Sequence, residues 1–377
     1  MIIFLSVLGA LLLFVVGYVL RGVYYIRKAK ALEAEVAQLE ASREADEAEA
    51  ARAVVARGFV PGDELNTELA APPTAERTAA LAAVEAGDWE AGAAWIEAAG
   101  GQNWDERWER IRALAELAAT DDAWLLEWQA ARPGDPVAAQ VNADASVLVA
   151  WNVRGSKRAN QTTREQFRVF HQLLAKAQEA AHEAARLADP ADPLPYMIEQ
   201  PMAMGLGYSN ERYEELWAEI TKRTTTSLNP HTGALQYWCA KWSGSHEEAE
   251  AFALAAAAKG APGELLSMLP LYAYFEQEQH ESDIDPDVWL KEPKIVAAVD
   301  AALADVAAAA PDDPRTVRVR HLLAWFLYWQ DRYEEAVEQF RLIDGWIGHA
   351  PWTYSGDPRD RYLNVRDYAV RQVHATD

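Results

Sequence analysis

The sequence predicts an all-α protein, with an N-terminal transmembrane helix and stalk followed by a solenoid of α-hairpins. Three observations lead to this fold class. The chain begins with a long uncharged apolar segment, strand-like alternation is missing from the body, and signals for helix starts recur along it. We divide the chain into a transmembrane anchor with a basic flank (1–28), a helical stalk (29–57), a linker (58–73) and an α-hairpin repeat domain (74–377).

Composition excludes several classes of protein. Half of the 377 residues are hydrophobic, which is not the composition of a disordered chain. The 35 lysines and arginines stand against 58 aspartates and glutamates, a net charge of −23 that speaks against nucleic acid as a partner. The single cysteine, Cys239, excludes an intrachain disulfide, a cysteine-based metal site and an N-terminal lipoprotein cysteine.

The predicted anchor runs from Ile2 to Leu20 without a charge, and as a helix it would span about 28 Å, close to the thickness of a bilayer core. A cleaved signal peptide is the alternative, but no basic residue precedes the segment and no typical cleavage site follows it. Arg21, Arg27 and Lys28 follow the span, so the positive-inside rule predicts a single-pass protein of the bacterial inner (plasma) membrane with a cytoplasmic C-terminal body. The reverse orientation, with the body outside the cytoplasm, remains an alternative.

The stalk segment 29–57 contains no glycine or proline and is rich in alanine, glutamate and arginine, a composition that favours a helix. One heptad-like seam is formed by Leu32, Val36 and Leu39. The next positions in this register are Arg43 and Asp46, so we expect a stalk helix and not a lasting coiled coil. Three prolines and two glycines in 58–73 indicate a linker.

Helix starts in the body are marked by Asp-Pro or Asn-Pro pairs. An Asp or Asn side chain caps the first turn, and proline fits the first helical position because its missing N–H is no loss there. These pairs are Asp135-Pro136, Asp192-Pro193, Asn229-Pro230, Asp313-Pro314 and Asp357-Pro358. Capping boxes are expected at Asn103/Glu106, Thr162/Glu165 and Ser245/Glu248.

The signals together predict helical pairs and one final helix. The pairs cover 74–86 with 88–99, 103–119 with 121–131, 136–154 with 162–187, 193–206 with 210–225, 230–243 with 245–259, 263–278 with 293–309, and 314–330 with 332–345. The last helix covers 358–374. Repeats of this length and type indicate a helical-hairpin solenoid.

One stretch carries a family resemblance. The segment 331–340, with Tyr333, Ala336 and Phe340, resembles the middle of a tetratricopeptide repeat, and 87–89, 210–213 and 244–252 resemble it in part. The stretches Trp151-Asn152-Val153-Arg154-Gly155 and Lys241-Trp242-Ser243-Gly244-Ser245 are similar to an uncharacterised, membrane-anchored bacterial branch of helical-repeat proteins. The resemblance implies a tetratricopeptide-like fold and supplies no activity.

The 15 tryptophans are patterned. Four pairs are spaced four residues apart, whereas random placement predicts about 0.6 such pairs. The pairs are Trp104/Trp108, Trp124/Trp128, Trp238/Trp242 and Trp325/Trp329. We expect these rings to fill the seams between helices; an aromatic groove for a peptide or hydrophobic ligand is the alternative.

No catalytic motif, metal site or cofactor site is predicted. The sequence HEEAE from His246 lacks the second histidine of a zincin, and the acidic run from Asp283 to Asp287 lacks the glycine and glutamate of a calcium loop. Phosphate-binding loops, dinucleotide fingerprints and the serine nucleophile motif are missing from the sequence. Cys239, eight residues after His231, is expected to be a buried structural thiol.

One local cluster of residues is basic, although the chain as a whole is strongly negative. It consists of Arg154, Lys157, Arg158, Arg164 and Arg168. We predict that the arginine guanidinium groups of this cluster bind a carboxylate or phosphate of a partner through paired hydrogen bonds. The alternative is structural: Arg154 and Lys157 would stabilise a helix C-terminus, with Gly155 providing the turn and the other cations pairing with acids.

The function predicted from these observations is a membrane-anchored, cytoplasm-facing helical-repeat scaffold that binds a protein or peptide partner. The alternative is an enzyme whose site lies between hairpins and uses residues such as Arg154, His231 and Lys241. Several titratable side chains with shifted pKa values in one closed pocket would favour the enzyme hypothesis.

Overall fold

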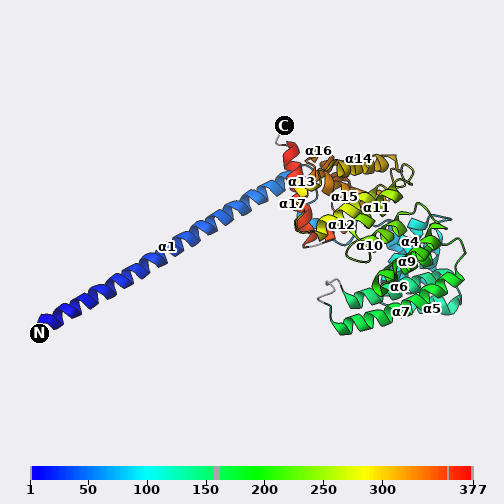
Figure 1. The fold of residues 1–377 in the computed structure, drawn as a ribbon, viewed down its shortest axis with the longest axis horizontal. Coiled ribbons are helices and arrows are strands. Elements are labelled where there is room, and N and C mark those ends of the chain that lie inside the picture. Colours follow the sequence, from blue (N-terminus) through cyan, green and yellow to red (C-terminus); the bar gives the residue numbers. More distant parts are fainter. Residues whose placement is uncertain (1, 156–161, 355, 375–377) are drawn as a thin grey trace. The chain divides into compact units, whose positions relative to one another are not determined.

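The computed structural model describes residues 2–155, 162–354 and 356–374; within the first helix it describes the side chains of 16–18, 20–39, 41–43 and 48–55. The chain forms two compact units, Met1–Glu64 and Leu65–Asp377. Within the described ranges the regular elements are helices, with one isolated parallel bridge between Asn66 and Trp346, so the all-α prediction is confirmed (Figure 1).

The first unit consists of α1 (Ile2–Val55) and a short 3-10 helix, η1 (Gly62–Glu64). The predicted anchor and stalk thus form one continuous helix of 54 residues. Among the described residues, no helix combines the length and the apolar character that crossing a bilayer requires. In the described part of α1, charged side chains follow Leu20 closely, beginning at Arg21 and continuing at Arg27 and Lys28. The predicted transmembrane helix from Ile2 to Leu20 is therefore wrong, and so is the inner-membrane, single-pass localisation that rested on it.

The second unit is a succession of helices connected by short turns (Figure 1). Its first half contains α2 (Ala75–Glu85), α3 (Trp89–Glu97), α4 (Trp104–Ala118), α5 (Ala123–Ala131), α6 (Pro136–Arg154), α7 (Arg164–Leu187), α8 (Leu194–Leu206) and α9 (Asn210–Thr221). Its second half contains α10 (Leu228–Trp238), α11 (His246–Ala257), α12 (Met268–His280), α13 (Pro286–Trp289), α14 (Pro293–Ala308), α15 (Thr316–Trp329), α16 (Tyr333–Ile343), η3 (Trp352–Tyr354) and α17 (Pro358–His374). Neighbours in sequence pack against one another, as in α-hairpin arrays.

Helices α6 and α11 begin where their caps predict, whereas α8 and α15 begin one and two residues later than predicted. The Asp135 carboxylate accepts a hydrogen bond from the Val137 N–H at 2.9 Å, and Pro136 is the first residue of α6. Ser245 caps α11 by accepting the Glu248 N–H at 3.1 Å. The capping box of α7 lies one residue later than predicted, because Thr163 pairs reciprocally with Gln166.

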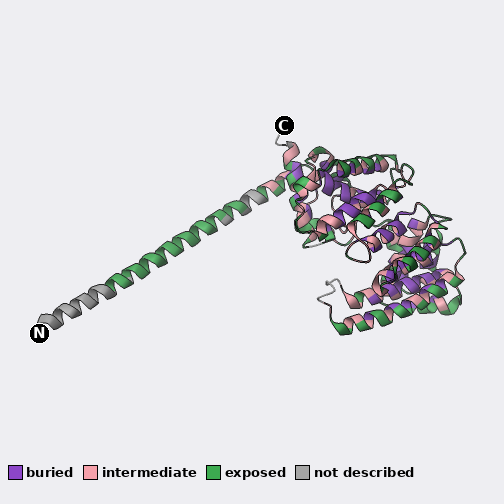
Figure 2. Cartoon of the chain, viewed as in Figure 1, coloured by how far each residue is buried: buried purple, intermediate pink, exposed green. Residues whose placement is uncertain are grey.

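The predicted packing of the tryptophans between helices is borne out in part. None of the 15 is an exposed residue, and five of them (Trp95, Trp124, Trp128, Trp325 and Trp352) are buried. Figure 2 shows the buried residues distributed over the helices of the second unit. The Trp128 and Trp352 rings are fully buried. The interpretation of the tryptophans as core residues is confirmed for the five buried rings, whereas the other ten are partly exposed.

Trp325→Ala tests this core. The side chain is 5% exposed, its Nε1–H donates to Glu278 Oε2 at 3.1 Å, and its ring contacts those of Phe275 and Trp352. We expect the free energy of unfolding, measured by urea denaturation, to fall by about 3–5 kcal/mol because a large cavity forms. The control Leu342→Ala removes a side chain that is 54% exposed and should change stability by less than about 0.5 kcal/mol. If both substitutions lower the free energy of unfolding by the same small amount, the Trp325 ring does not stabilise the core.

Candidate functional site

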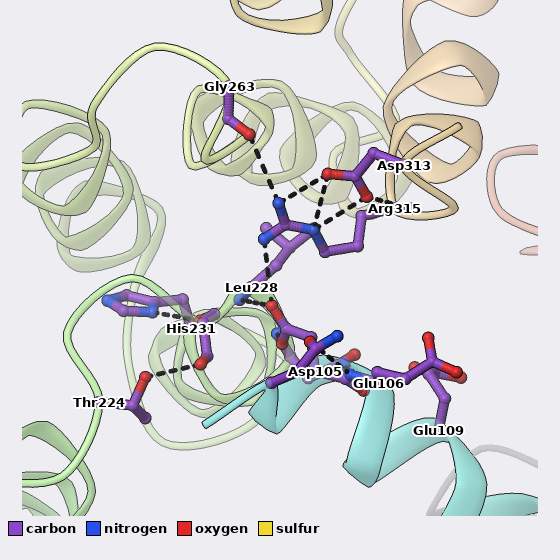
Figure 3. A network of polar contacts seen from close by, with 12 residues as sticks. Asp105, Glu106, Glu109, Thr224, Leu228, His231, Gly263, Asp313 and Arg315 are labelled. Atoms are coloured by element: carbon purple, nitrogen blue, oxygen red, sulfur yellow. Dashed lines mark hydrogen bonds and ion pairs between the residues drawn. The ribbon is translucent and has the colours of Figure 1, made fainter. Parts of the chain in front are cut away.

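Asp105, the second residue of α4, connects early and late helices of the second unit. Its buried carboxylate accepts the Leu228 N–H at 2.9 Å on Oδ2 and the Asn229 N–H at 3.0 Å on Oδ1 (Figure 3). These are the first two residues of α10, whose own N-cap residue, Ser227, makes no side-chain capping bond. Asp105 therefore caps α10 from another helix, where a carboxylate satisfies free N–H groups and favours the positive end of the helix dipole. The predicted start of this helix at Pro230 is thus late by two residues, and Asn229 is not its cap.

Two arginines of the α15 start complete the junction. Arg315 Nη1 lies 3.3 Å from Asp105 Oδ2, and the same guanidinium binds Asp313 at 2.7 Å (Figure 3). Arg318 donates to Asn229 Oδ1 at 2.6 Å and also binds Glu109. The N-terminal ends of α4, α10 and α15 therefore meet, so the hairpin array closes on itself.

A second connection joins the segment before α2 to the segment after α16. The Asn66 N–H donates to the Gly345 carbonyl and the Ile347 N–H donates to the Asn66 carbonyl, both at 2.8 Å. The Gly348 N–H donates to the Leu69 carbonyl at 2.9 Å. A Cβ atom at Gly348 would lie 2.3 Å from the backbone of the 68–69 peptide, so only glycine permits this approach.

His321 holds the same segment from α15. Its Nδ1 accepts the Trp352 Nε1–H at 2.8 Å, so its Nε2–H donates to the Ala70 carbonyl at 3.2 Å. Both ring nitrogens are thus satisfied in the neutral form. Burial, with a smaller contribution from His349, lowers the pKa of His321 to about 3. Burial and then the charge of Arg318 lower the pKa of His349 to about 4, so both imidazoles are neutral at pH 7.

These connections enclose a cleft of about 440 Å³, which we name the closure cleft. Its walls are the segment 68–74, the start of α4, the starts of α10 and α15, and residues 348–349. Its carboxylates are Glu68, Glu76, Asp105, Glu106, Glu109 and Glu116, and its arginines are Arg77, Arg110, Arg315 and Arg318. Six negative and four positive side chains give the lining a formal charge of −2.

Most of the cations in the closure cleft are already engaged. Arg110 binds Glu106 at 2.8 Å and donates to the Trp95 carbonyl, while Arg315 and Arg318 hold the junction. Several of the acids are less constrained. Glu76 lies 3.8 Å from Arg110 and is 61% exposed, and Glu68 is exposed as well. The cleft therefore presents acceptors to a ligand.

The predicted basic cluster lies elsewhere. Arg154 donates to the Gly155 carbonyl at 3.0 Å and stacks on Trp151 and Trp242. The Arg168 guanidinium is engaged by Glu165, with 3.0 Å between Nε and Oε2, and Arg164 is exposed at the start of α7. Lys157 and Arg158 lie outside the described residues. Partner binding by this cluster stays a prediction, and its described members do not line the closure cleft.

The residues of the alternative enzyme hypothesis are held by different partners. His231 is buried, with Nδ1 2.7 Å from the Ser227 carbonyl, and Lys241 binds Glu276 Oε1 at 2.7 Å. Burial lowers the pKa of His231. Cys239 is buried, and burial raises the pKa of its thiol to about 12, so it is a structural thiol as expected. Over the ranges that the structure describes, no three or more His, Cys, Asp or Glu side chains are arranged to hold a metal ion.

Asp105, Glu109, Arg315 and Arg318 were not singled out from the sequence. Asp313-Pro314 marked the start of α15, but neither spacing nor periodicity indicates that this start contacts α4, about 210 residues earlier.

No protein-family model matches the chain, and no curated protein or solved structure matches it significantly. The resemblance to tetratricopeptide repeats therefore remains a prediction.

Asp105→Ala tests the junction. The change leaves the Leu228 and Asn229 N–H groups and part of the Arg315 guanidinium without their acceptor. We expect the free energy of unfolding to fall by about 3–5 kcal/mol, as when a buried charge loses its partner. Asp88→Ala, which removes an exposed cap from α3, should cost only about 1 kcal/mol in the same denaturation series. If Asp105→Ala lowers the free energy of unfolding no more than Asp88→Ala does, the stabilising role of the junction is contradicted.

The buried His321 predicts a dependence of stability on pH. Its folded pKa lies below the unfolded value, so the unfolded chain binds more protons and stability falls as pH falls from about 7 toward 4. His321 should account for about 3 kcal/mol of this loss at pH 4. His321→Gln, which keeps a donor and an acceptor, should make the slope of unfolding free energy against pH shallower over that range. Identical slopes for the two proteins would refute this assignment.

Proposed function

We propose that this chain is a helical-repeat binding protein and that its closure cleft receives a basic segment of a protein partner. The observation that carries the proposal is the cleft of about 440 Å³, with six carboxylates and four arginines in its lining. This volume is within the usual range for ligand clefts. Because the array closes on itself, the walls of the cleft come from segments far apart in sequence and are held in position by the junction.

The charge of the cleft supports a cationic group as the ligand. Arg110, Arg315 and Arg318 are engaged by neighbouring acceptors, whereas Glu68 and Glu76 stand at an exposed edge. A lysine ammonium or arginine guanidinium would gain charge-assisted hydrogen bonds from these carboxylates. The net charge of −23 would also attract a basic partner over a distance and increase the association rate.

The apolar part of the lining supports a long side chain. Trp95, Leu69, Pro72 and Pro73 border the same cleft as the carboxylates. Lysine and arginine side chains pack their aliphatic stems on apolar surfaces and direct the charge to polar groups. A basic peptide is therefore better matched to this lining than an acidic or purely apolar one.

Selection of peptides from a random displayed library on the full chain tests this function. We expect enrichment of sequences that contain lysine or arginine, with affinity that falls as salt concentration rises. The double variant Glu68→Lys and Glu76→Lys should weaken the selected peptides about tenfold, which is about 1.4 kcal/mol. The control variant Glu97→Lys and Glu127→Lys makes the same charge change at exposed positions outside the cleft and should have little effect. No enrichment, or equal loss in both variants, would refute the proposal.

A further inference from the structure

The helix α1 carries a large amount of unpartnered apolar surface. Every described side chain from 16 to 39 is exposed (Figure 2). The large hydrophobic residues among them are 40–76% exposed: Val16, Tyr18, Leu20, Val23, Tyr24, Tyr25, Ile26, Leu32, Val36 and Leu39. Exposed apolar surface on this scale marks an interaction surface, and long single helices gain most of their stability from packing.

The spacing of half of these residues indicates the type of partner: Tyr18, Tyr25, Leu32, Val36 and Leu39 follow a heptad pattern, whereas the other five lie at other heptad positions. The seam of Leu32, Val36 and Leu39 continues toward the N-terminus with alternating steps of three and four residues. The full series is Tyr18 (d), Gly22 (a), Tyr25 (d), Ala29 (a), Leu32 (d), Val36 (a) and Leu39 (d), where a and d are the inward positions of a heptad. The charged residues from Arg21 to Glu35 all fall at other positions. This is the pattern of one helix in a coiled coil, about three heptads long.

The residue types favour a coiled coil of two parallel helices. A β-branched residue at a, here Val36, combined with leucine at d, here Leu32 and Leu39, is the preference of parallel dimers. In such a dimer, a residue at position g of one helix faces a residue at position e of the following heptad of the other helix. Lys28 (g) would then face Glu33 (e) of the second copy, an opposite-charge pair made twice in the dimer. An antiparallel dimer pairs g with g and e with e and would not make this contact.

We infer that residues 18–39 of α1 pair in parallel and in register with the same residues of a second copy of this chain. The pairing ends where the next inward positions are Arg43 and Asp46, whose charges are incompatible with a buried seam. This dimer is independent of the closure cleft, because no residue of 18–39 lines that cleft.

Disulfide formation between variants of the full chain that each carry one introduced cysteine tests the geometry. Leu32→Cys places a thiol at an inward position, whereas Ala34→Cys places one two residues away on the outer face, at position f. On mild oxidation, we expect the covalent dimer of Leu32→Cys to form at least tenfold faster than that of Ala34→Cys. The unmodified chain, whose only cysteine is the buried Cys239, gives the background rate. Equal rates for the two variants would overturn the proposal.

Sedimentation measurements on the full chain provide a second test. We expect a monomer–dimer equilibrium that Leu32→Asp shifts at least tenfold toward the monomer. The thermal unfolding of the second unit should be unchanged in that variant, which separates loss of pairing from loss of folding. A monomeric unmodified chain, or a dimer that Leu32→Asp leaves intact, would contradict the proposal.

Discussion

One buried carboxylate, that of Asp105, determines how the hairpins of the second unit are connected. It takes the place of a side-chain cap for α10 and binds Arg315 at the start of α15. Three helix N-termini, each with unsatisfied N–H groups and a positive dipole end, would repel one another without an anion between them. The Asp105 carboxylate allows these ends to meet and converts an array of hairpins into a closed arrangement.

The closure cleft is a consequence of this arrangement. Its acidic residues come from α4, from the segment before α2 and from the first turn of α2, and two of its four arginines stand at the start of α15. Backbone pairing between 66–69 and 345–348 and the His321 contact hold the second wall. A binding site built from such distant segments is sensitive to the stability of the whole unit. The dimer seam on α1, in contrast, depends on a single helix, so the two association surfaces can be altered independently.

The helices were predictable because their signals are local. Asp135 caps its own helix, and tryptophans spaced four residues apart lie on one helix face, which for Trp124 and Trp128 is the buried face of α5. The role of Asp105 was not predictable, since its acceptor function depends on N–H groups more than 120 residues away. The candidate site was missed for the same reason: charge counted along the chain pointed to the cluster around Arg154, whereas the closure cleft gathers charges that are distant in sequence. The membrane span was predicted from a window of uncharged residues, and the described part of α1 does not support it.

Hydrogen exchange of individual backbone amides tests the central role of Asp105 most directly. First-turn amides of a helix usually exchange rapidly with water because they have no intrahelical acceptor. In this protein the amides of Leu228 and Asn229 are bound to the buried carboxylate, so we predict protection close to that of the core amides of α10. Exchange of these two amides as fast as that of a fraying helix end would contradict the account.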